Sequence, residues 1–138
     1  MMHYLSLGEL NVIKNSEDEL CRHVAKYIQE KQSFQSIITL NITMLPHYLN
    51  CADTYSFVKN EAWIIPDGVS ICAWLGWRHQ CRVSRVTGID LVHKLLSNVH
   101  LKVACIGASP DVILRAVDTI HKKYSKSQYM ILRMEQNF

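Results

Sequence analysis

Short apolar runs rich in β-branched residues alternate along this chain with longer segments whose apolar residues recur at helical spacing. The apolar runs predict buried strands at residues 36–41, 62–65, 81–86, 102–106 and 129–132. The periodic segments predict helices near residues 17–31, 43–50, 53–59, 69–77 and 89–99, and a last helix that begins at residue 110. This alternation predicts an α/β fold, a Rossmann-like layered domain with a mainly parallel sheet flanked by helices.

Capping and turn residues support these boundaries. Ser16 and Glu19 have the spacing of a capping box, which predicts a helix that begins directly after Ser16. Pro66-Asp67-Gly68 ends one apolar run, and Ser109-Pro110 has the form of a helix start, with Ser109 as the N-cap.

Length and composition favour one folded domain over residues 1–138. Apolar residues make up 49% and charged residues 20% of the chain, a balance that excludes a disordered or low-complexity protein. No apolar run approaches the roughly 18 residues of a membrane span, and the first ten residues lack the pattern of a signal peptide. We therefore expect a cytoplasmic protein. Its five cysteines form no CxxC pair and are expected to be free thiols.

Charge is unevenly distributed along the chain. Residues 1–77 contain five Lys/Arg and eight Asp/Glu, whereas residues 78–138 contain ten and four. The basic half is compatible with an anionic ligand such as a phosphate, a nucleotide or a lipid head group, and equally with a solvated surface. It lacks the interleaved aromatic residues of a single-strand nucleic-acid binder, so no nucleic-acid partner is expected.

Parallel sheets bind ligands beyond the carboxyl ends of their strands, and the best candidate for chemistry there is Asp67. It follows an apolar strand, between a proline that fixes the turn and a glycine that permits close approach. A carboxylate in that position can accept a proton from a sugar hydroxyl as a general base. The alternative is an ordinary turn aspartate that caps the following helix.

Three further residues follow predicted strands. Thr39 and Asn41 alternate with apolar residues at a strand end, and a hydroxyl next to an amide suits a polyol, although both could instead satisfy nearby backbone groups. Arg85 precedes a predicted helix start, where it could clamp a diphosphate with help from the helix N-terminus, or be a surface cation. Asp90 falls in the first turn of that helix, where the dipole already favours a carboxylate.

Several common sites are not supported. Gly107-Ala108-Ser109-Pro110 is a tight turn with a cap rather than a dinucleotide or P-loop motif. The seven histidines show neither HxxxH nor HExxH spacing, so no metal site and no metal cofactor are expected. There is also no GxSxG nucleophile elbow.

Taken in order, these motifs resemble those of glycosyltransferase family 26, the bacterial N-acetylmannosaminyltransferases of teichoic acid, enterobacterial common antigen and capsule synthesis. The resemblance covers roughly residues 8–124. The segments that carry it are Thr39-Leu40-Asn41, Pro66-Asp67-Gly68, Arg85-Val86-Thr87-Gly88-Ile89-Asp90-Leu91 and Ile106-Gly107-Ala108-Ser109-Pro110.

The resemblance implies transfer of N-acetylmannosamine, or a related hexose derivative, from a UDP-sugar to a polyprenyl-diphosphate-linked N-acetylglucosamine at the inner face of the membrane. Asp67 matches the catalytic base of the family. Thr39, Asn41 and Gly68 match residues of the substrate pocket, and Arg85 matches an arginine suited to phosphate charge. The family requires no metal, so cationic side chains and backbone N–H groups must stabilise the leaving diphosphate.

The sequence also departs from the family pattern. Family members continue into a second part that helps to bind the nucleotide sugar and meets the membrane, so the chain is expected to correspond to the N-terminal part of a longer glycosyltransferase. The helix after Gly68 is bulkier here, with Trp74 and Trp77. A truncated, non-catalytic member that binds a ligand or partner without turnover is therefore the alternative to an active enzyme. Peripheral membrane contact and a homo-oligomer are both compatible with the sequence.

Overall fold

The computed structural model describes residues 1–30, 34–107, 109–124 and 128–131. By their internal contacts these residues divide into two compact units, residues 1–92 and 93–138. The single α/β domain expected over residues 1–138 stays a prediction.

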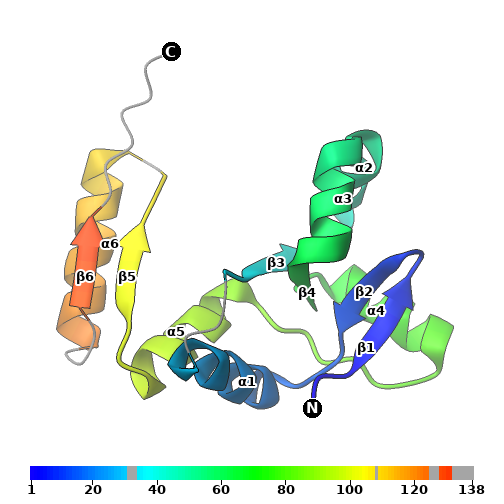
Figure 1. The fold of residues 1–138 in the computed structure, drawn as a ribbon, viewed down its shortest axis with the longest axis horizontal. Helices are drawn as coiled ribbons and strands as arrows, with labels where there is room; N and C mark the ends of the chain where they lie inside the picture. The colour runs from blue at the N-terminus through cyan, green and yellow to red at the C-terminus, as the bar shows by residue number, and fades with distance from the viewer. Residues whose placement is uncertain (31–33, 108, 125–127, 132–138) are drawn as a thin grey trace. The chain divides into compact units, whose positions relative to one another are not determined.

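The first unit is built on a four-stranded sheet with the strand order β1-β2-β4-β3 (Figure 1). Its strands are β1 (Tyr4–Leu7), β2 (Leu10–Ile13), β3 (Ser36–Leu40) and β4 (Ala62–Pro66). The β1–β2 pair is antiparallel, and β4 lies parallel to both β2 and β3. The α/β class with a mainly parallel sheet is thereby confirmed.

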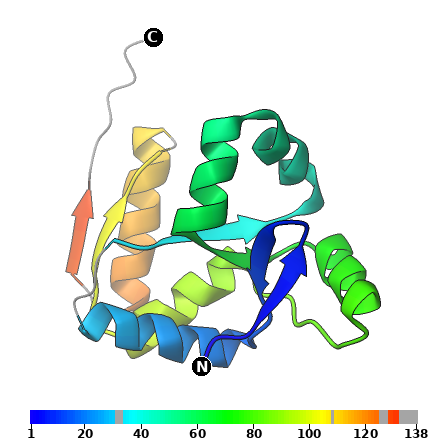
Figure 2. The same ribbon diagram turned by 45° about the vertical axis from the view of Figure 1, so that its right-hand side comes forward.

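Helices pack against both faces of this sheet. They are α1 (Glu17–Gln29), the 3-10 turn η1 (Ile42–Met44), α2 (Leu45–Asn50), α3 (Ala52–Glu61) and α4 (Val69–His79). Figures 1 and 2 show α1 on one side of the sheet and the α2–α3 pair on the other. A further helix, α5 (Gly88–Asn98), begins in the first unit and ends in the second.

The start of α1 follows from its cap. The Ser16 hydroxyl accepts from the backbone N–H of Glu19, and the Glu19 carboxylate accepts from the Ser16 backbone N–H, so the predicted capping box is confirmed. Beyond the cap, α1 packs on β4 through Trp63. Its ring lies 5.2 Å from that of His23 and 5.0 Å from that of Tyr27, centroid to centroid.

The core of the first unit joins the sheet to α2, α3 and α4. It is one cluster of buried residues: Leu10, Val12, Leu40, Tyr48, Val58, Ile64, Ile71 and Leu75. Because β3 and β4 each contribute to this cluster, both central strands are anchored in the core.

The second unit contains a βαβ crossover: β5 (Lys102–Cys105), α6 (Pro110–Lys123) and β6 (Gln128–Ile131), with β5 and β6 parallel. The predicted strand at 129–132 therefore matches β6, although Leu132 lies outside the described residues. Pro110 occupies the first turn of α6 as expected. Ser109 is the N-cap by position, but its side chain makes no capping hydrogen bond.

One strand prediction was wrong, and one pair of strands was missed. Residues 81–86 belong to no strand of the described structure: the segment meets the sheet at the end of β4, where the Val86 backbone N–H donates to the Pro66 carbonyl. The segment instead runs back from α4, whose last turn is ended by Gln80 in the left-handed conformation at φ 49°. The hairpin of β1 and β2, closed at Gly8 with φ 61°, was not predicted.

Candidate functional site

The carboxyl ends of β3 and β4 lie side by side. In the parallel register Thr39 pairs with Ile65 and Leu40 with Pro66, so both strands end at the same level. The Leu40 carbonyl then accepts from the backbone N–H of Asp67 at 3.0 Å and from that of Gly68 at 3.3 Å. These bonds hold the Pro66-Asp67-Gly68 turn against the end of β3, at the edge where open α/β sheets bind ligands.

Two glycines allow the neighbouring segments to approach these strand ends. A Cβ atom on Gly68 would lie 3.3 Å from both Cα and Cβ of Asn41. A Cβ atom on Gly88, at the start of α5, would lie only 2.7 Å from the Cγ2 methyl of Thr39, closer than real Cβ atoms come. The two contacts therefore bring the turn at 66–68 and the segment at 85–88 onto the residues that end β3.

The Arg85 side chain contacts both the backbone and the side chain of Asp67. The guanidinium Nε donates to the Asp67 carbonyl, and Nη2 lies 3.3 Å from the carboxylate Oδ1. One residue further on, the Val86 backbone N–H donates to the Pro66 carbonyl at 3.0 Å, and the Val86 side chain is buried. The buried valine anchors the segment, and the arginine extends from it over the turn.

The Asp67 carboxylate is accessible and does not cap α4. The N-cap of α4 is Gly68, and no side chain caps that helix start. The Asp67 side chain keeps 29% of its surface exposed and that of Arg85 53%. A carboxylate that is accessible and held by one cation still has free lone pairs, which can accept a hydrogen bond from a ligand hydroxyl. If Asp67 capped α4 instead, its oxygens would be engaged by backbone N–H groups.

Asn41 has a structural role whatever else it does. Its Oδ1 accepts from the backbone N–H of Thr43 at 3.0 Å and of Met44 at 3.2 Å, and from the Thr43 hydroxyl at 2.6 Å. It is the N-cap of η1. The expectation that a polar residue at this strand end satisfies nearby backbone groups is therefore confirmed for its oxygen, and the Asn41 amide NH₂ is the part suited to a substrate.

The start of α5 is closed by its own residues. The Thr87 hydroxyl accepts from the backbone N–H of Asp90 at 3.1 Å and donates to the Asp90 carboxylate. This pair confirms the first-turn role expected for Asp90. The N-terminus of α5 therefore already faces the Asp90 carboxylate. It is not open to help Arg85 bind a diphosphate, as the sequence had suggested.

Cys72 was not considered a site residue from the sequence. It lies in the first turn of α4, with its Sγ 3.7 Å from the Pro66 carbonyl. Burial raises the pKa of this thiol, and the nearby Arg85 guanidinium partly offsets that rise. Its position five residues after Asp67, in the first turn of the predicted helix, was the only signal for it in the sequence.

Three of the four motif segments thus meet in the first unit: 39–41, 66–68 and 85–90. The fourth, at 106–110, belongs to the second unit. There Gly107 has φ 101°, as a tight turn requires, and Ala108 lies outside the described residues.

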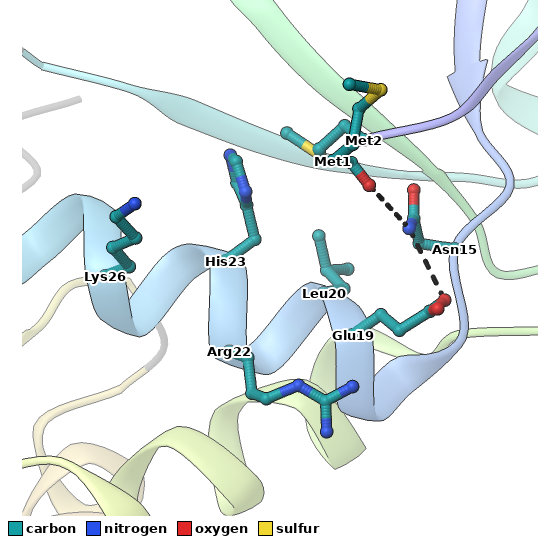
Figure 3. Close-up of a pocket in the computed structure, with 8 residues that line it drawn as sticks. All are labelled: Met1, Met2, Asn15, Glu19, Leu20, Arg22, His23 and Lys26. Atoms are coloured by element: carbon teal, nitrogen blue, oxygen red, sulfur yellow. Dashed lines mark hydrogen bonds between the residues drawn. The ribbon is translucent and has the colours of Figure 1, made fainter.

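A separate hollow of about 300 Å³ lies beside α1 and shares no residue with the strand-end site (Figure 3). Buried Asn15 ties the residues that precede β1 to the start of α1. The Asn15 Oδ1 accepts from the His3 backbone N–H at 2.7 Å, and its Nδ2 donates to the Met1 carbonyl at 3.2 Å and to the Glu19 carboxylate at 3.4 Å. These hydrogen bonds hold the first three residues against the start of α1. Nothing in the network suggests catalysis.

The described residues contain neither a cluster of metal-ligand side chains nor a helix that could span a membrane. Within residues 1–30, 34–107, 109–124 and 128–131, no three His, Cys, Asp or Glu side chains come together as metal ligands would. Over the same ranges, none of the helices has the length and apolar character that crossing a bilayer demands. The expectation that no metal is needed stays a prediction.

Open α/β sheets bind ligands at the carboxyl ends of their strands, and in this chain a carboxylate, an arginine and an amide gather at that edge. Comparison with known families is specific: the glycosyl transferase WecG/TagA/CpsF family matches residues 5–136, and the chain belongs to that family. A search of curated proteins returns no match.

Proposed function

We propose that this chain transfers N-acetylmannosamine, or a related hexose derivative, from a UDP-sugar to a polyprenyl-diphosphate-linked N-acetylglucosamine. Membership in the WecG/TagA/CpsF glycosyltransferase family supports a sugar donor and an acceptor. The observation that carries the proposal is the accessible Asp67 carboxylate beside Arg85, at the carboxyl ends of β3 and β4.

In the proposed reaction an acceptor hydroxyl oxygen attacks the anomeric carbon of the donor sugar. The bond from that carbon to the diphosphate oxygen breaks, UDP leaves with the electron pair, and the hydroxyl proton passes to Asp67. A positioned general base contributes about 10²–10⁴-fold to such a step. Because Arg85 holds only one carboxylate oxygen, Oδ1, the other oxygen is available to the acceptor.

Arg85 is proposed to stabilise the departing diphosphate. Its guanidinium is more than half exposed, and its planar array of donors matches phosphate oxygens. The first backbone N–H groups of α4 point out of an uncapped helix end next to the same turn, and they would add to the stabilisation of negative charge. Thr39 and the Asn41 amide are proposed to line the sugar pocket.

The proposal places the reaction at the inner face of the cell membrane, where a lipid-linked acceptor would be presented. The test is an assay of UDP release and product formation by the purified chain, with a UDP-sugar and a lipid-linked N-acetylglucosamine acceptor. Wild type should turn over, and Asp67→Asn should be slower by about 10²-fold or more. Asp53→Asn is the matched control, because Asp53 is exposed in the first turn of α3.

An active wild type with an equally active Asp67→Asn variant would remove the proposed base. Donor binding without any turnover by wild type would favour the alternative, a family member that binds without catalysis.

A further inference from the structure

Helix α4 is apolar on the side that packs into the core and also on the side that faces outward. Its inner side chains Ile71 and Leu75 are fully buried against the sheet. On the outer side Val69 is 69% exposed, Trp74 39% and Trp77 76%. A helix that is apolar all round is normally enclosed by protein or placed in contact with lipid.

The outer residues form a continuous strip. Val69, Ala73 and Trp77 follow one another at a spacing of four residues, so they share one helix face, and all three are exposed. Trp74 lies one turn before Trp77. Figure 2 shows α4 beside the β1–β2 hairpin at the margin of the first unit, and its contacts include β1 and β4. We call Val69, Ala73, Trp74 and Trp77 the α4 strip.

The segment that contains the α4 strip is basic. Residues 68–89 contain three arginines and one histidine but no aspartate or glutamate. Arg78 follows Trp77 directly, and both Arg78 and Arg82 are exposed. Exposed tryptophans beside unpaired positive charge are typical of proteins that rest on the surface of an anionic membrane.

We propose that the α4 strip, with Arg78 and Arg82, is a docking surface for an anionic lipid bilayer. The tryptophans would enter the boundary between head groups and acyl chains, and the arginines would extend their guanidinium groups to lipid phosphates. A second copy of the chain fits this face less well. A twofold contact through it would bring two cationic sets together without an acidic partner.

The α4 strip lies next to Asp67, so membrane docking could bring a lipid-linked acceptor to the proposed catalytic base. This link rests on the proposed function. Val69 stands two residues after Asp67, and the strip extends from there to Trp77, about 12 Å along the helix axis. A bilayer held by α4 would present the head of a lipid-linked acceptor close to the Pro66-Asp67-Gly68 turn. The affinity of the strip for an anionic surface does not depend on that chemistry.

The test is flotation of the full chain with vesicles of phosphatidylcholine alone or of phosphatidylcholine with phosphatidylglycerol. Wild type should float with the anionic vesicles, and salt should weaken this binding. Trp77→Ser should bind at least about tenfold more weakly, and Arg82→Gln about fivefold more weakly.

The matched controls remove similar groups elsewhere. Phe34→Ser deletes an aromatic side chain that is 87% exposed, and Lys26→Gln deletes a cation whose side chain is 73% exposed. Both should bind as wild type does, and urea unfolding should confirm that every variant is folded. Equal binding by Trp77→Ser and wild type, or no binding of wild type to anionic vesicles, would overturn the proposal.

Two further readouts separate this inference from the proposed function and from self-association. Asp67→Asn should keep vesicle binding while losing transfer, and Trp77→Ser should keep transfer to a water-soluble acceptor analogue. Vesicle binding without any transfer by wild type would defeat the proposed function alone. A sedimentation experiment in which Trp77→Ser dissociates a dimer, with vesicle binding unchanged, would assign the α4 strip to a second copy instead.

Discussion

The guanidinium of Arg85 donates two hydrogen bonds to Asp67: Nε donates to the backbone carbonyl, and Nη2 donates to the carboxylate Oδ1 at 3.3 Å. These residues are eighteen positions apart in the sequence and are brought together by the return of the chain after α4. By holding Oδ1, the guanidinium can orient Oδ2, the second oxygen of the carboxylate. The same guanidinium can also form charge-assisted hydrogen bonds to a phosphate group when a ligand brings one.

We predict that Arg85→Gln weakens the binding of UDP by about tenfold or more, because a hydrogen bond to a charged group contributes about 1.5–3 kcal/mol. Arg85→Lys should lose less, since it keeps the charge but not the planar fork. Isothermal titration calorimetry with UDP measures both. Arg82→Gln is the control, an exposed arginine three positions earlier. Equal losses at Arg82 and Arg85 would indicate a diffuse charge effect rather than a defined contact.

Gly88→Ala should destabilise the protein by about 1–3 kcal/mol, because the new methyl would collide with Cγ2 of Thr39. Helix propensity alone predicts the opposite sign, since alanine is the better helix former. The two residues should be coupled: in a Thr39→Ser background, which lacks that methyl, most of the cost should disappear. Urea unfolding of the four proteins measures the coupling, and additive effects of the two substitutions would show that the close approach does not exist.

Cys51 should be alkylated before Cys72 near neutral pH. A hydrogen bond from the Thr54 hydroxyl, 3.1 Å from Cys51 Sγ, is the main cause that lowers the pKa of the exposed Cys51 thiol. Burial raises the pKa of Cys72. Because the thiolate is the reactive form, the rate at Cys72 should rise only at more alkaline pH.

Iodoacetamide labelling followed by peptide mass spectrometry reads both rates. Thr54→Val should slow the reaction of Cys51 and leave Cys72 unchanged. Faster labelling of Cys72 than of Cys51 at neutral pH would contradict the burial of its thiol.

Glu19→Gln should lower stability at neutral pH, and the difference from wild type should vanish in acid. The Ser16 backbone N–H, and then its hydroxyl, hold the pKa of Glu19 below its ordinary value. A lowered folded-state pKa stabilises the protein at pH values above the unfolded-state pKa, and this contribution is lost as the pH falls through the folded value. Urea unfolding near neutral pH and at about pH 3 gives both differences. Glu17→Gln, in the same helix turn but outside the capping box, is the control.

The sequence was informative where local chemistry decides the structure. The capping box at Ser16, the apolar runs that became β3 and β4, and the proline-glycine turn around Asp67 each carry their own short-range signal. The polar residues at the strand ends could be placed together because parallel strands end at one edge of a sheet.

Non-local contacts explain what the sequence did not reveal. Residues 81–86 have the composition of a strand, but they meet the sheet at the end of β4, through Val86 and Pro66, and pair with no strand of the described structure. The contact of Gly88 with Thr39 and that of Arg85 with Asp67 depend on how the extended segment 81–87 returns to the sheet. No pattern within that segment encodes this path.

The central claim is that Asp67 acts on the chemical step rather than on donor binding. Single-turnover transfer at saturating UDP-sugar, together with the calorimetric affinity for UDP, tests it directly. We predict that Asp67→Asn binds UDP within about threefold of wild type and transfers sugar at least about 10²-fold more slowly. A variant that transfers at the wild-type rate once donor is saturating would contradict the account.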